Sequence, residues 1–218
     1  MSESLLPTSG SAEIGRHVPS GPSHGTTVDP EAWIAALSGH VATSRDGHRV
    51  WARTRNPRAG FAGHAAANIE FHAPEYIGYA RLRLRHDPAI GFVAMVNTLH
   101  LRRTVRGQGV GAGIVASWAR RLSELGIREL QFEAVSEGHL TSGRLFWARD
   151  GALFRDPQAP HRLLDRLAET AEAEAGAIRE LRRRVDSGEL STPADLYRDP
   201  RGRRALAADD WAGRWPLG

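Results

Sequence analysis

Glycine occupies every second position from residue 107 to residue 113 of this 218-residue chain, at the start of an amphipathic helical pattern. The segment Arg106-Gly107-Gln108-Gly109-Val110-Gly111 follows an apolar run from Gly91 to Leu101, and apolar residues then recur at spacings of three and four up to Leu125. Each glycine at a helix start costs roughly 0.5–1 kcal/mol relative to alanine. A ligand that compensates for this weakness would explain it, so the pattern predicts a binding loop.

The chemistry of this loop favours a phosphate ligand. The first turn of a helix has unpaired backbone N–H groups and the positive end of the helix dipole. Glycines lack a Cβ atom and let the backbone approach a phosphate closely. The stretch from Glu75 to Arg128 holds nine Arg and three acidic residues, a net charge of +6 (9 − 3), which attracts anions. The sequence therefore predicts a diphosphate-binding loop at Gln108 to Ala112, flanked by Arg102, Arg103 and Arg106.

Hydrophobic periodicity predicts one mixed α/β domain over residues 29–158. Asp29-Pro30-Glu31 has the residues of a helix start. A meander of strands is expected next, with a turn at Asn56 to Gly60 and a buried central strand over Gly91 to Leu101. The other expected elements are strands over 48–55, 66–72, 76–85, 129–135 and 152–155 and helices over 110–125 and 141–150.

The two ends of the chain differ from this domain. Residues 1–28 are rich in Ser, Gly, Pro and Thr and predict a disordered tail, without the apolar stretch of a secretory signal. Residues 159–218 predict a helical C-terminal extension, with one long helix over Pro160 to Val185 that has a single apolar stripe. Such a stripe packs within its own domain or against a second copy, so a homodimer through this helix stays open.

Composition narrows the possible functions. The chain has no Cys, which excludes a disulfide framework and a thiolate nucleophile. No segment approaches the ~20 apolar residues of a membrane span, so no membrane partner and a cytoplasmic location are expected. The ten His residues show no metal-ligand spacing, and no metal site is predicted.

The segment resembles the signature of the GNAT superfamily of acyl-CoA N-acyltransferases, Arg/Gln-x-x-Gly-x-Gly/Ala, at Arg106, Gly109 and Gly111. The resemblance covers roughly Gly91 to Phe154, and Leu99-His100-Leu101 is similar to the strand end that precedes the signature in the family. It implies a mixed, mostly antiparallel sheet flanked by helices, with acetyl-CoA or another acyl-CoA as co-substrate. In the family, the splayed strand end pairs with the pantetheine amides and the loop N–H groups hold the pyrophosphate. The implied coenzyme-binding residues are Leu99, His100, Leu101, Arg106, Gly107, Gln108, Gly109, Val110, Gly111 and Ala112.

The resemblance also implies a reaction, the transfer of an acyl group from acyl-CoA to a primary amine by direct attack in a ternary complex. The acceptor would be a small-molecule or peptide amine. Trp147 stands where the family has the Tyr that often reprotonates the coenzyme thiolate, and Asn97 stands where many members have a base. Candidate bases are therefore the ionisable residues Glu133, His100 and Glu70, each in a predicted strand.

Three other interpretations stay open. A GNAT-like module that binds acyl-CoA or an anionic partner without turnover would be consistent with Trp147 and Asn97. Gly107-x-Gly109-x-x-Ala112 also fits a dinucleotide-binding fingerprint, although a meander precedes it in place of alternating strands and helices. A nucleic-acid partner rests on the Arg-rich middle alone, where Arg81, Arg83 and Arg85 alternate on one strand face, a pattern more typical of a solvated strand.

Overall fold

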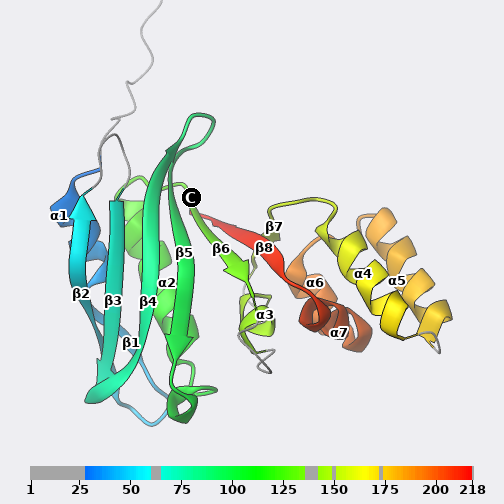
Figure 1. Cartoon of the computed structure of the whole chain (residues 1–218), viewed down its shortest axis with the longest axis horizontal. Helices are drawn as coiled ribbons and strands as arrows, with labels where there is room; N and C mark the ends of the chain where they lie inside the picture. The colour runs from blue at the N-terminus through cyan, green and yellow to red at the C-terminus, as the bar shows by residue number, and fades with distance from the viewer. Residues whose placement is uncertain (1–27, 60–64, 136–141, 149–150, 172–173, 218) are drawn as a thin grey trace, which may run out of the picture.

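The computed structural model describes residues 28–59, 65–135, 142–148, 151–171 and 174–217. Its core is an eight-stranded sheet in the order β1-β2-β3-β4-β5-β6-β8-β7 (Figure 1). Among the described strands, β5 and β6 are the one parallel pair. The predicted fold class, a mixed and mostly antiparallel sheet flanked by helices, is confirmed. The predicted tail lies outside the described residues except for Val28.

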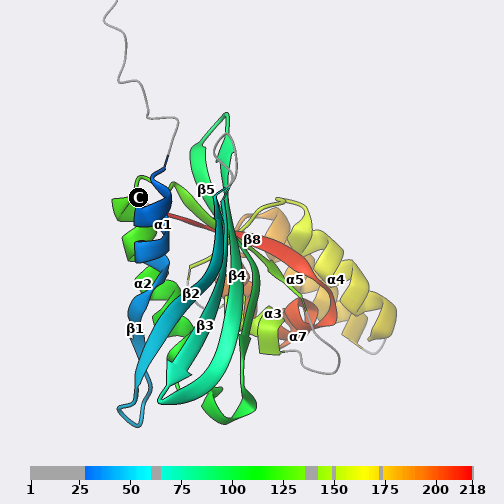
Figure 2. The ribbon, with the colours of Figure 1, turned by 60° about the vertical axis from the view of Figure 1, so that its left-hand side comes forward.

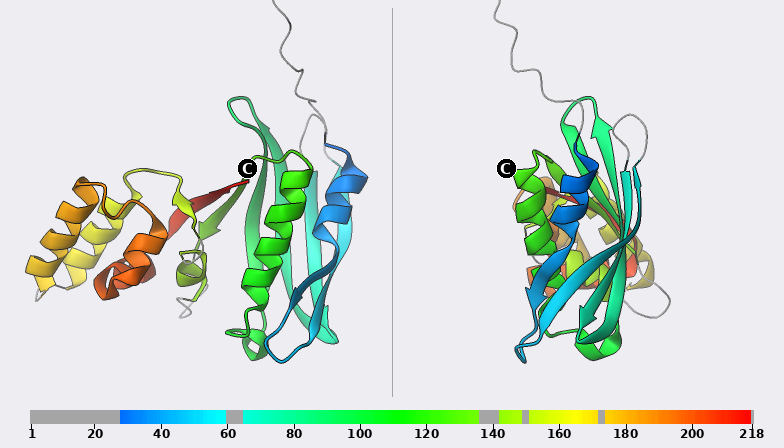
Figure 3. Two further views of the ribbon diagram at one scale, coloured as in Figure 1. Left: turned by 180° about the vertical axis from the view of Figure 1, so that it is seen from behind. Right: turned by 90° about the vertical axis from the view of Figure 1, so that its left-hand side faces the viewer.

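Five consecutive strands form an antiparallel meander. They are β1 (Gly39–Thr43), β2 (Arg49–Ala59), β3 (Ala65–Ala73), β4 (Glu75–Asp87) and β5 (Gly91–Leu101). Their side chains alternate between a buried and an open face: Ala80, Leu82 and Leu84 of β4 are buried, while Arg81 and Arg83 are exposed. The helices α1 (Pro30–Leu37) and α2 (Val110–Glu124) lie on the buried face of this meander (Figures 2 and 3).

The two helices are joined by side chains of α2 that satisfy the end of α1. Asp29 caps the start of α1 by accepting hydrogen bonds from the N–H groups of Glu31 and Ala32. At the other end, Arg121 donates to the carbonyl oxygens of Ser38 (2.5 Å) and His40 (2.7 Å). These bonds serve carbonyls at and just beyond the end of α1, where the helix leaves acceptors unpaired. They position α2 beside the first strand.

Two details of the meander differ from the sequence prediction. The strand β1 was not expected, because only five residues separate the end of the predicted helix from a turn at Ser44 to His48. The predicted turn at Asn56 to Gly60 is wrong up to Ala59, since the backbone stays in β2 to that residue. The register between β2 and β3 shifts between Arg55 and Arg58, so a bulge accommodates Pro57 within a strand.

The second part of the sheet contains β6 (Glu129–Ala134), β7 (Leu153–Phe154) and β8 (Trp211–Pro216), with α3 (Ser142–Trp147) beside them. The strand β8 lies between β6 and β7, so residues 211–216 belong to the sheet although the predicted domain boundary places them in the extension. Trp211 and Trp215 turn their rings onto Phe132 of β6. Gly213 leaves room for this, because a Cβ there would lie 2.3 Å from Phe132 Cζ. Burial of these aromatic rings explains why the segment returns to the sheet.

The residues between β7 and β8 form a helical lobe beyond this edge of the sheet (Figure 1). It contains α4 (Ala159–Thr170), α5 (Ala175–Asp186), α6 (Pro193–Arg198) and α7 (Pro200–Ala208). The single helix predicted over Pro160 to Val185 is wrong: it is divided into α4 and α5, which pack on each other. Leu163, Leu167, Ile178 and Leu181 of the predicted stripe are buried within the chain. The stripe that suggested a homodimer is therefore already covered.

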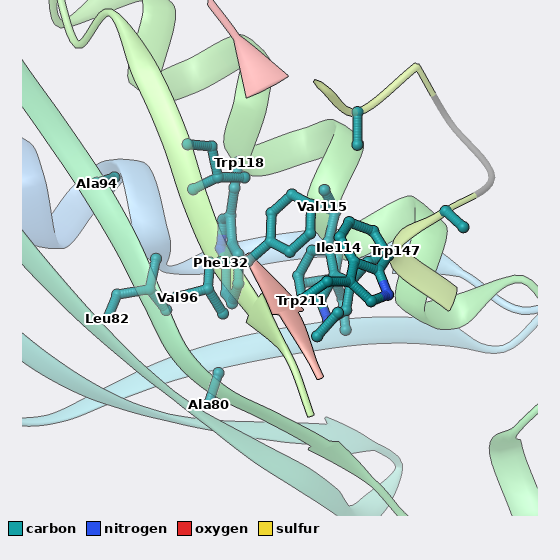
Figure 4. Close-up of a cluster of buried hydrophobic side chains, with 14 of the residues drawn as sticks. Ala80, Leu82, Ala94, Val96, Ile114, Val115, Trp118, Phe132, Trp147 and Trp211 are labelled. Carbon is teal, nitrogen blue, oxygen red and sulfur yellow. The ribbon is translucent and has the colours of Figure 1, made fainter. Parts of the chain in front are cut away.

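One hydrophobic cluster connects both parts of the sheet. Ala80, Leu82, Ala94 and Val96 of β4 and β5 face Ile114, Val115 and Trp118 of α2, and Phe132, Trp147 and Trp211 continue the cluster (Figure 4). Trp147 stacks on Phe132 with a centroid distance of 4.3 Å. Phe132 pairs with Val96 and shares its face of the sheet, so α2 and α3 both pack on this cluster.

Candidate functional site

The parallel strands β5 and β6 pair over only four residues each. Val93 to Val96 lie opposite Glu129 to Phe132, and beyond this point the two strands diverge (Figure 1). The strand β5 continues along β4 to Leu101, whereas β6 continues along β8 to Ala134. The divergence begins at a bulge, because Leu82 pairs with Val96 and Arg81 with Thr98, which leaves Asn97 unpaired. We call the gap between Asn97–Leu101 and the end of β6 the strand split.

The backbone groups of Leu99 and Leu101, at the end of β5, face this split. The N–H of Arg102 donates to the carbonyl oxygen of Ile77 in β4 at 2.8 Å, and a Cβ added to Gly78 of β4 would lie 2.2 Å from the carbonyl oxygen of His100. His100 and Arg102 therefore direct their backbone groups toward β4. Backbone direction alternates along a strand, so the N–H and C=O groups of Leu99 and Leu101 point into the split. An extended chain of amides could pair with them, but His100 offers only its side chain near this site.

The glycine loop begins where β5 ends. A short 3-10 helix (η1, Arg103–Val105) leads to Gly107 and Gly109, which have φ angles of 78° and 81°. These left-handed conformations favour glycine. Gly109 is the N-cap of α2, and the first helical bond of the backbone runs from the N–H of Gly113 to its carbonyl oxygen. The N–H groups of residues 110–112 precede that bond and so form the anion-binding end of the helix.

The loop is also tied to the body of the protein. Arg106 donates from Nε to the carbonyl oxygen of Leu101 at 2.8 Å. The side-chain amide of Gln108 donates to the carbonyl oxygen of Thr104 at 3.2 Å, and the backbone N–H of Arg45 donates to the carbonyl oxygen of Gln108 at 3.1 Å. Arg106 and Gln108 thus hold the loop in shape, a role that the sequence pattern did not reveal.

The four alternating glycines have two different roles. A Cβ atom added to Gly107 or Gly109 would meet nothing within 4 Å, so these positions border open space. A Cβ on Gly111 would lie 3.0 Å from the ring of Phe146 in α3, and one on Gly113 would lie 2.8 Å from the Cβ of Ala42 in β1. Gly111 and Gly113 therefore allow close helix packing, whereas Gly107 and Gly109 allow the left-handed turn of the loop and leave its surface open to a ligand.

A cleft of about 320 Å³ lies between the glycine loop and the neighbouring ends of the strands β1 to β4. Its lining includes Asp46, Glu75, Arg102 and Gln108. Hydrogen bonds from the hydroxyl of Ser44 and from His48 lower the pKa of Asp46, which favours its charged form. Since Asp46 and Glu75 are both carboxylates, the cleft itself is a poor place for a diphosphate. The start of α2 is the better anion site.

The three candidate bases lie in different places. Glu133 is exposed and is the first residue of β6 beyond the last β5–β6 pair. His100 lies on β5 across the strand split, with its ring stacked on Tyr79 at a centroid distance of 5.5 Å. Glu70 is two strands away on β3 and accepts a hydrogen bond from Arg55 Nε at 3.0 Å. The structure therefore places His100 and Glu133 beside the split and Glu70 in an ion pair outside it.

Trp147 and Asn97, at the positions where the resemblance implies an acid and a base, can serve as neither. Trp147 is buried against Phe132, and its indole is a hydrogen-bond donor without a usable proton near neutral pH. Asn97 is exposed at the bulge. Tyr79, which the sequence did not single out, carries the phenol nearest in register to the split, because Tyr79 pairs with His100. Only the pairing of β4 with β5 could have revealed it.

Two kinds of site are not found in the described part of the chain. It contains no group of three His, Asp or Glu residues that could hold a metal ion. None of its helices has the length and apolar character that a membrane crossing requires.

The comparison with known proteins found similar solved structures. No protein-family model and no curated sequence matches the chain. Among solved structures, it is similar to Arabidopsis thaliana Naa50 in complex with a bisubstrate analogue, CoA-Ac-MVNAL (16% identity, TM-score 0.34, 41% of this chain and 58% of that one). It is also similar to a tandem GNAT protein from the clavulanic acid biosynthesis pathway (21% identity, TM-score 0.37, 43% of this chain and 30% of that one). A third similar structure is a putative acyl-CoA N-acyltransferase from Klebsiella pneumoniae subsp. pneumoniae MGH 78578 (14% identity, TM-score 0.38, 70% of this chain and 73% of that one).

The match to the first two structures spans less than two thirds of their lengths. Because these TM-scores are below 0.5, the assignment of the fold rests on features of the chain itself. These are the antiparallel meander, the parallel β5–α2–β6 unit, the strand split and the glycine loop at the start of α2. On these features, the chain has a GNAT-like fold.

Proposed function

We propose that this protein is an acyl-CoA-dependent N-acyltransferase that transfers an acetyl or other acyl group to a primary amine. The observation that carries the proposal is the strand split beside the start of α2. It joins two kinds of backbone site at one place: the N–H and C=O groups of Leu99 with the N–H of Leu101 for an amide-containing arm, and the N–H groups of residues 110–112 for a diphosphate. Acyl-CoA has both of these parts.

When bound, acyl-CoA supplies an activated thioester carbonyl. Leu99 and Leu101 would orient its arm along β5, and the loop from Arg106 to Ala112 would hold its phosphates. The reaction then needs the acceptor amine in its neutral form, and Glu133 or His100 would accept the proton, directly or through one water. The new C–N bond replaces the C–S bond, and the thiolate leaves. Orientation within one ternary complex supplies much of the rate.

The coenzyme site can be tested with a matched pair of glycine variants. Gly109 and Gly126 lie at opposite ends of α2, both have positive φ angles, and a Cβ at either would meet nothing within 4 Å. We expect Gly109→Trp to abolish acetyl-CoA binding in a calorimetric titration, because the indole would occupy the phosphate position. Gly126→Trp has the same backbone strain and should bind normally. Equal loss in both variants would contradict the assigned site.

The same titration with NAD addresses the dinucleotide interpretation. The parallel β5–α2–β6 unit stands alone among the described strands, without the alternating series that such a site requires. We expect no NAD binding.

Turnover separates the enzyme from the alternative, a GNAT-like module that binds acyl-CoA or an anionic partner. Product formation with any primary amine excludes the module. If the protein is an enzyme, Glu133→Gln or His100→Gln should lower kcat while leaving acetyl-CoA binding intact. Glu70→Gln is the comparison variant, because Glu70 lies outside the split and should leave kcat unchanged.

A further inference from the structure

The open face of the meander has an excess of positive charge next to the strand split. Six arginines point to this face from β2 and β4, and two acidic residues lie among them. The arginines are Arg49, Arg53, Arg55, Arg81, Arg83 and Arg85, and the acidic residues are Glu70 and Asp87. The helices α1 and α2 cover only the opposite face (Figure 3). Anything that binds this face therefore meets arginine side chains.

The arginines of this face differ in their surroundings. Arg55 pairs with Glu70, and Arg85 contacts Gln131 at 3.2 Å and Asp87 at 3.8 Å. Arg53, Arg81 and Arg83 are exposed, and none of the three forms an ion pair or a side-chain hydrogen bond with any other residue that the structure describes. Of these three, Arg81 and Arg83 lie on β4, the strand next to β5. Two guanidinium groups two residues apart on one strand face repel each other. A bound anion would offset this repulsion.

The position of this pair connects it with the reaction. Arg81 lies opposite Thr98, and Arg83 lies opposite Met95, so the two arginines flank the bulge at Asn97 on the neighbouring strand. Side chains opposite each other on adjacent strands lie about 5 Å apart at Cβ. The bulge is where β5 leaves β6, two residues before Leu99, where the proposed function places the amide arm of acyl-CoA. An amine that attacks from the open face must approach past Arg81 and Arg83.

We propose that Arg81 and Arg83 bind an anionic group of the acceptor, so that the preferred acceptors are primary amines that also carry a carboxylate or a phosphate. This inference rests on the proposed function and defines its substrate class. A guanidinium binds both anions through two parallel N–H bonds. Cationic polyamines would be repelled from the same face. Carboxylate and phosphate share this chemistry, and the experiment distinguishes them.

The test compares acceptors in pairs that differ in one charge. With acetyl-CoA as donor, kcat/KM is measured for an amino acid and its amide, and for phosphoethanolamine and ethanolamine. We expect the charged member of at least one pair to be preferred about 10-fold or more, the factor that about 1.4 kcal/mol of binding gives. The preferred pair then shows whether the site takes a carboxylate or a phosphate. Equal kcat/KM within both pairs, or a preference for the neutral members, would overturn the inference.

Variants show whether the arginines cause the preference. In Arg81→Gln/Arg83→Gln, we expect KM for the charged acceptor to rise about 10-fold or more, with kcat/KM for the neutral acceptor and the Kd for acetyl-CoA unchanged. Arg120→Gln removes an exposed arginine of α2 on the opposite face and should change neither value. An increased Kd for acetyl-CoA in the double variant would assign the arginines to the coenzyme and overturn the inference.

Failure of the inference can be told from failure of the proposed function. Turnover of neutral amines without a charge preference contradicts the inference alone. If no amine is acetylated, the same charged and neutral compounds are titrated calorimetrically into the protein with coenzyme A present. Selective binding of the charged compounds, lost in the double variant, would then support the acceptor site without turnover, and absence of such binding would overturn the inference as well.

Discussion

Arg106 donates a hydrogen bond from Nε to the carbonyl oxygen of Leu101, the last residue of β5, at 2.8 Å. This bond occupies the last carbonyl that β5 directs into the strand split and, through the same side chain, ties the glycine loop to the strand. The loop is therefore anchored to the end of the strand that borders the split. A side chain whose position in the sequence suggests a phosphate contact instead shapes the site.

The first prediction concerns this bond. Arg106→Gln is expected to raise the Kd for acetyl-CoA about 10-fold, because loss of a charge-assisted hydrogen bond costs about 1.5–3 kcal/mol and the loop loses its attachment. Calorimetry measures the Kd. Arg103→Gln, at an exposed position of η1 three residues earlier, removes the same charge and is the control. Equal effects of the two variants would mean that charge alone matters and that the bond to Leu101 does not.

A second prediction concerns Gly213 in β8. Gly213→Ala should lower the free energy of unfolding by about 1–3 kcal/mol, because the new methyl group would lie 2.3 Å from Phe132 Cζ and overpack the cluster. Urea denaturation at pH 7 measures the change. The control is Gly176→Ala in α5, where the nearest atom to a new Cβ is 3.9 Å away and helix propensity should make the change neutral or stabilising. A neutral Gly213→Ala variant would show that β8 does not pack on β6 as described.

A third prediction concerns the contact between α1 and α2. Arg121→Met keeps much of the side-chain volume but removes the donors to Ser38 and His40. We expect a loss of about 1–3 kcal/mol in the free energy of unfolding, because part-buried carbonyls are left without partners. Arg120→Met on the exposed side of α2 should change this free energy by less than about 0.5 kcal/mol. A similar loss in both variants would point to helix propensity in place of the hydrogen bonds.

A fourth prediction concerns the pH dependence of the helical lobe. A hydrogen bond from Arg204, together with the charges of Arg204 and Arg201, lowers the pKa of Glu174 below its ordinary value of 4.5. A carboxylate whose pKa is lower in the folded state stabilises it at pH values above 4.5, and this contribution is lost as the pH falls through the lowered pKa. The stability difference between the wild type and Glu174→Gln should therefore be constant near neutral pH and shrink in acid. Thermal unfolding at several pH values measures it, and a difference that grows in acid would contradict the assignment.

Much of the meander could be predicted from local patterns. The strand Gly91–Leu101 and the start of α2 at Val110 were predicted to the residue, because a continuous apolar run and a spacing of three and four are strong signals. The glycine loop was also identified, but its four glycines could not be divided into two roles. That division depends on Phe146 and Ala42, which approach α2 from distant parts of the chain.

Other features depend on long-range pairing and gave no local signal. The stripe over Pro160 to Val185 has the period of one helix, yet burial of both halves is achieved by two helices packed together. The place of Trp211 and Trp215 in the sheet follows from their fit onto Phe132, which a sequence alone does not show. Among the candidate bases, only the register of the sheet separates Glu70 from His100 and Glu133.

The position of β8 has a consequence for the order of folding. Ala134 pairs with Trp211 and Glu129 with Pro216, separations of 77 (211 − 134) and 87 (216 − 129) residues, whereas every pair within the meander is joined by a short turn or loop. Closing so long a loop costs entropy before any contact forms, which delays such pairing. The meander and α2 can therefore assemble during synthesis, while one arm of the strand split remains without its neighbour until the segment after α7 has emerged. The proposed competence to bind acyl-CoA would then appear only after β8 has paired with β6.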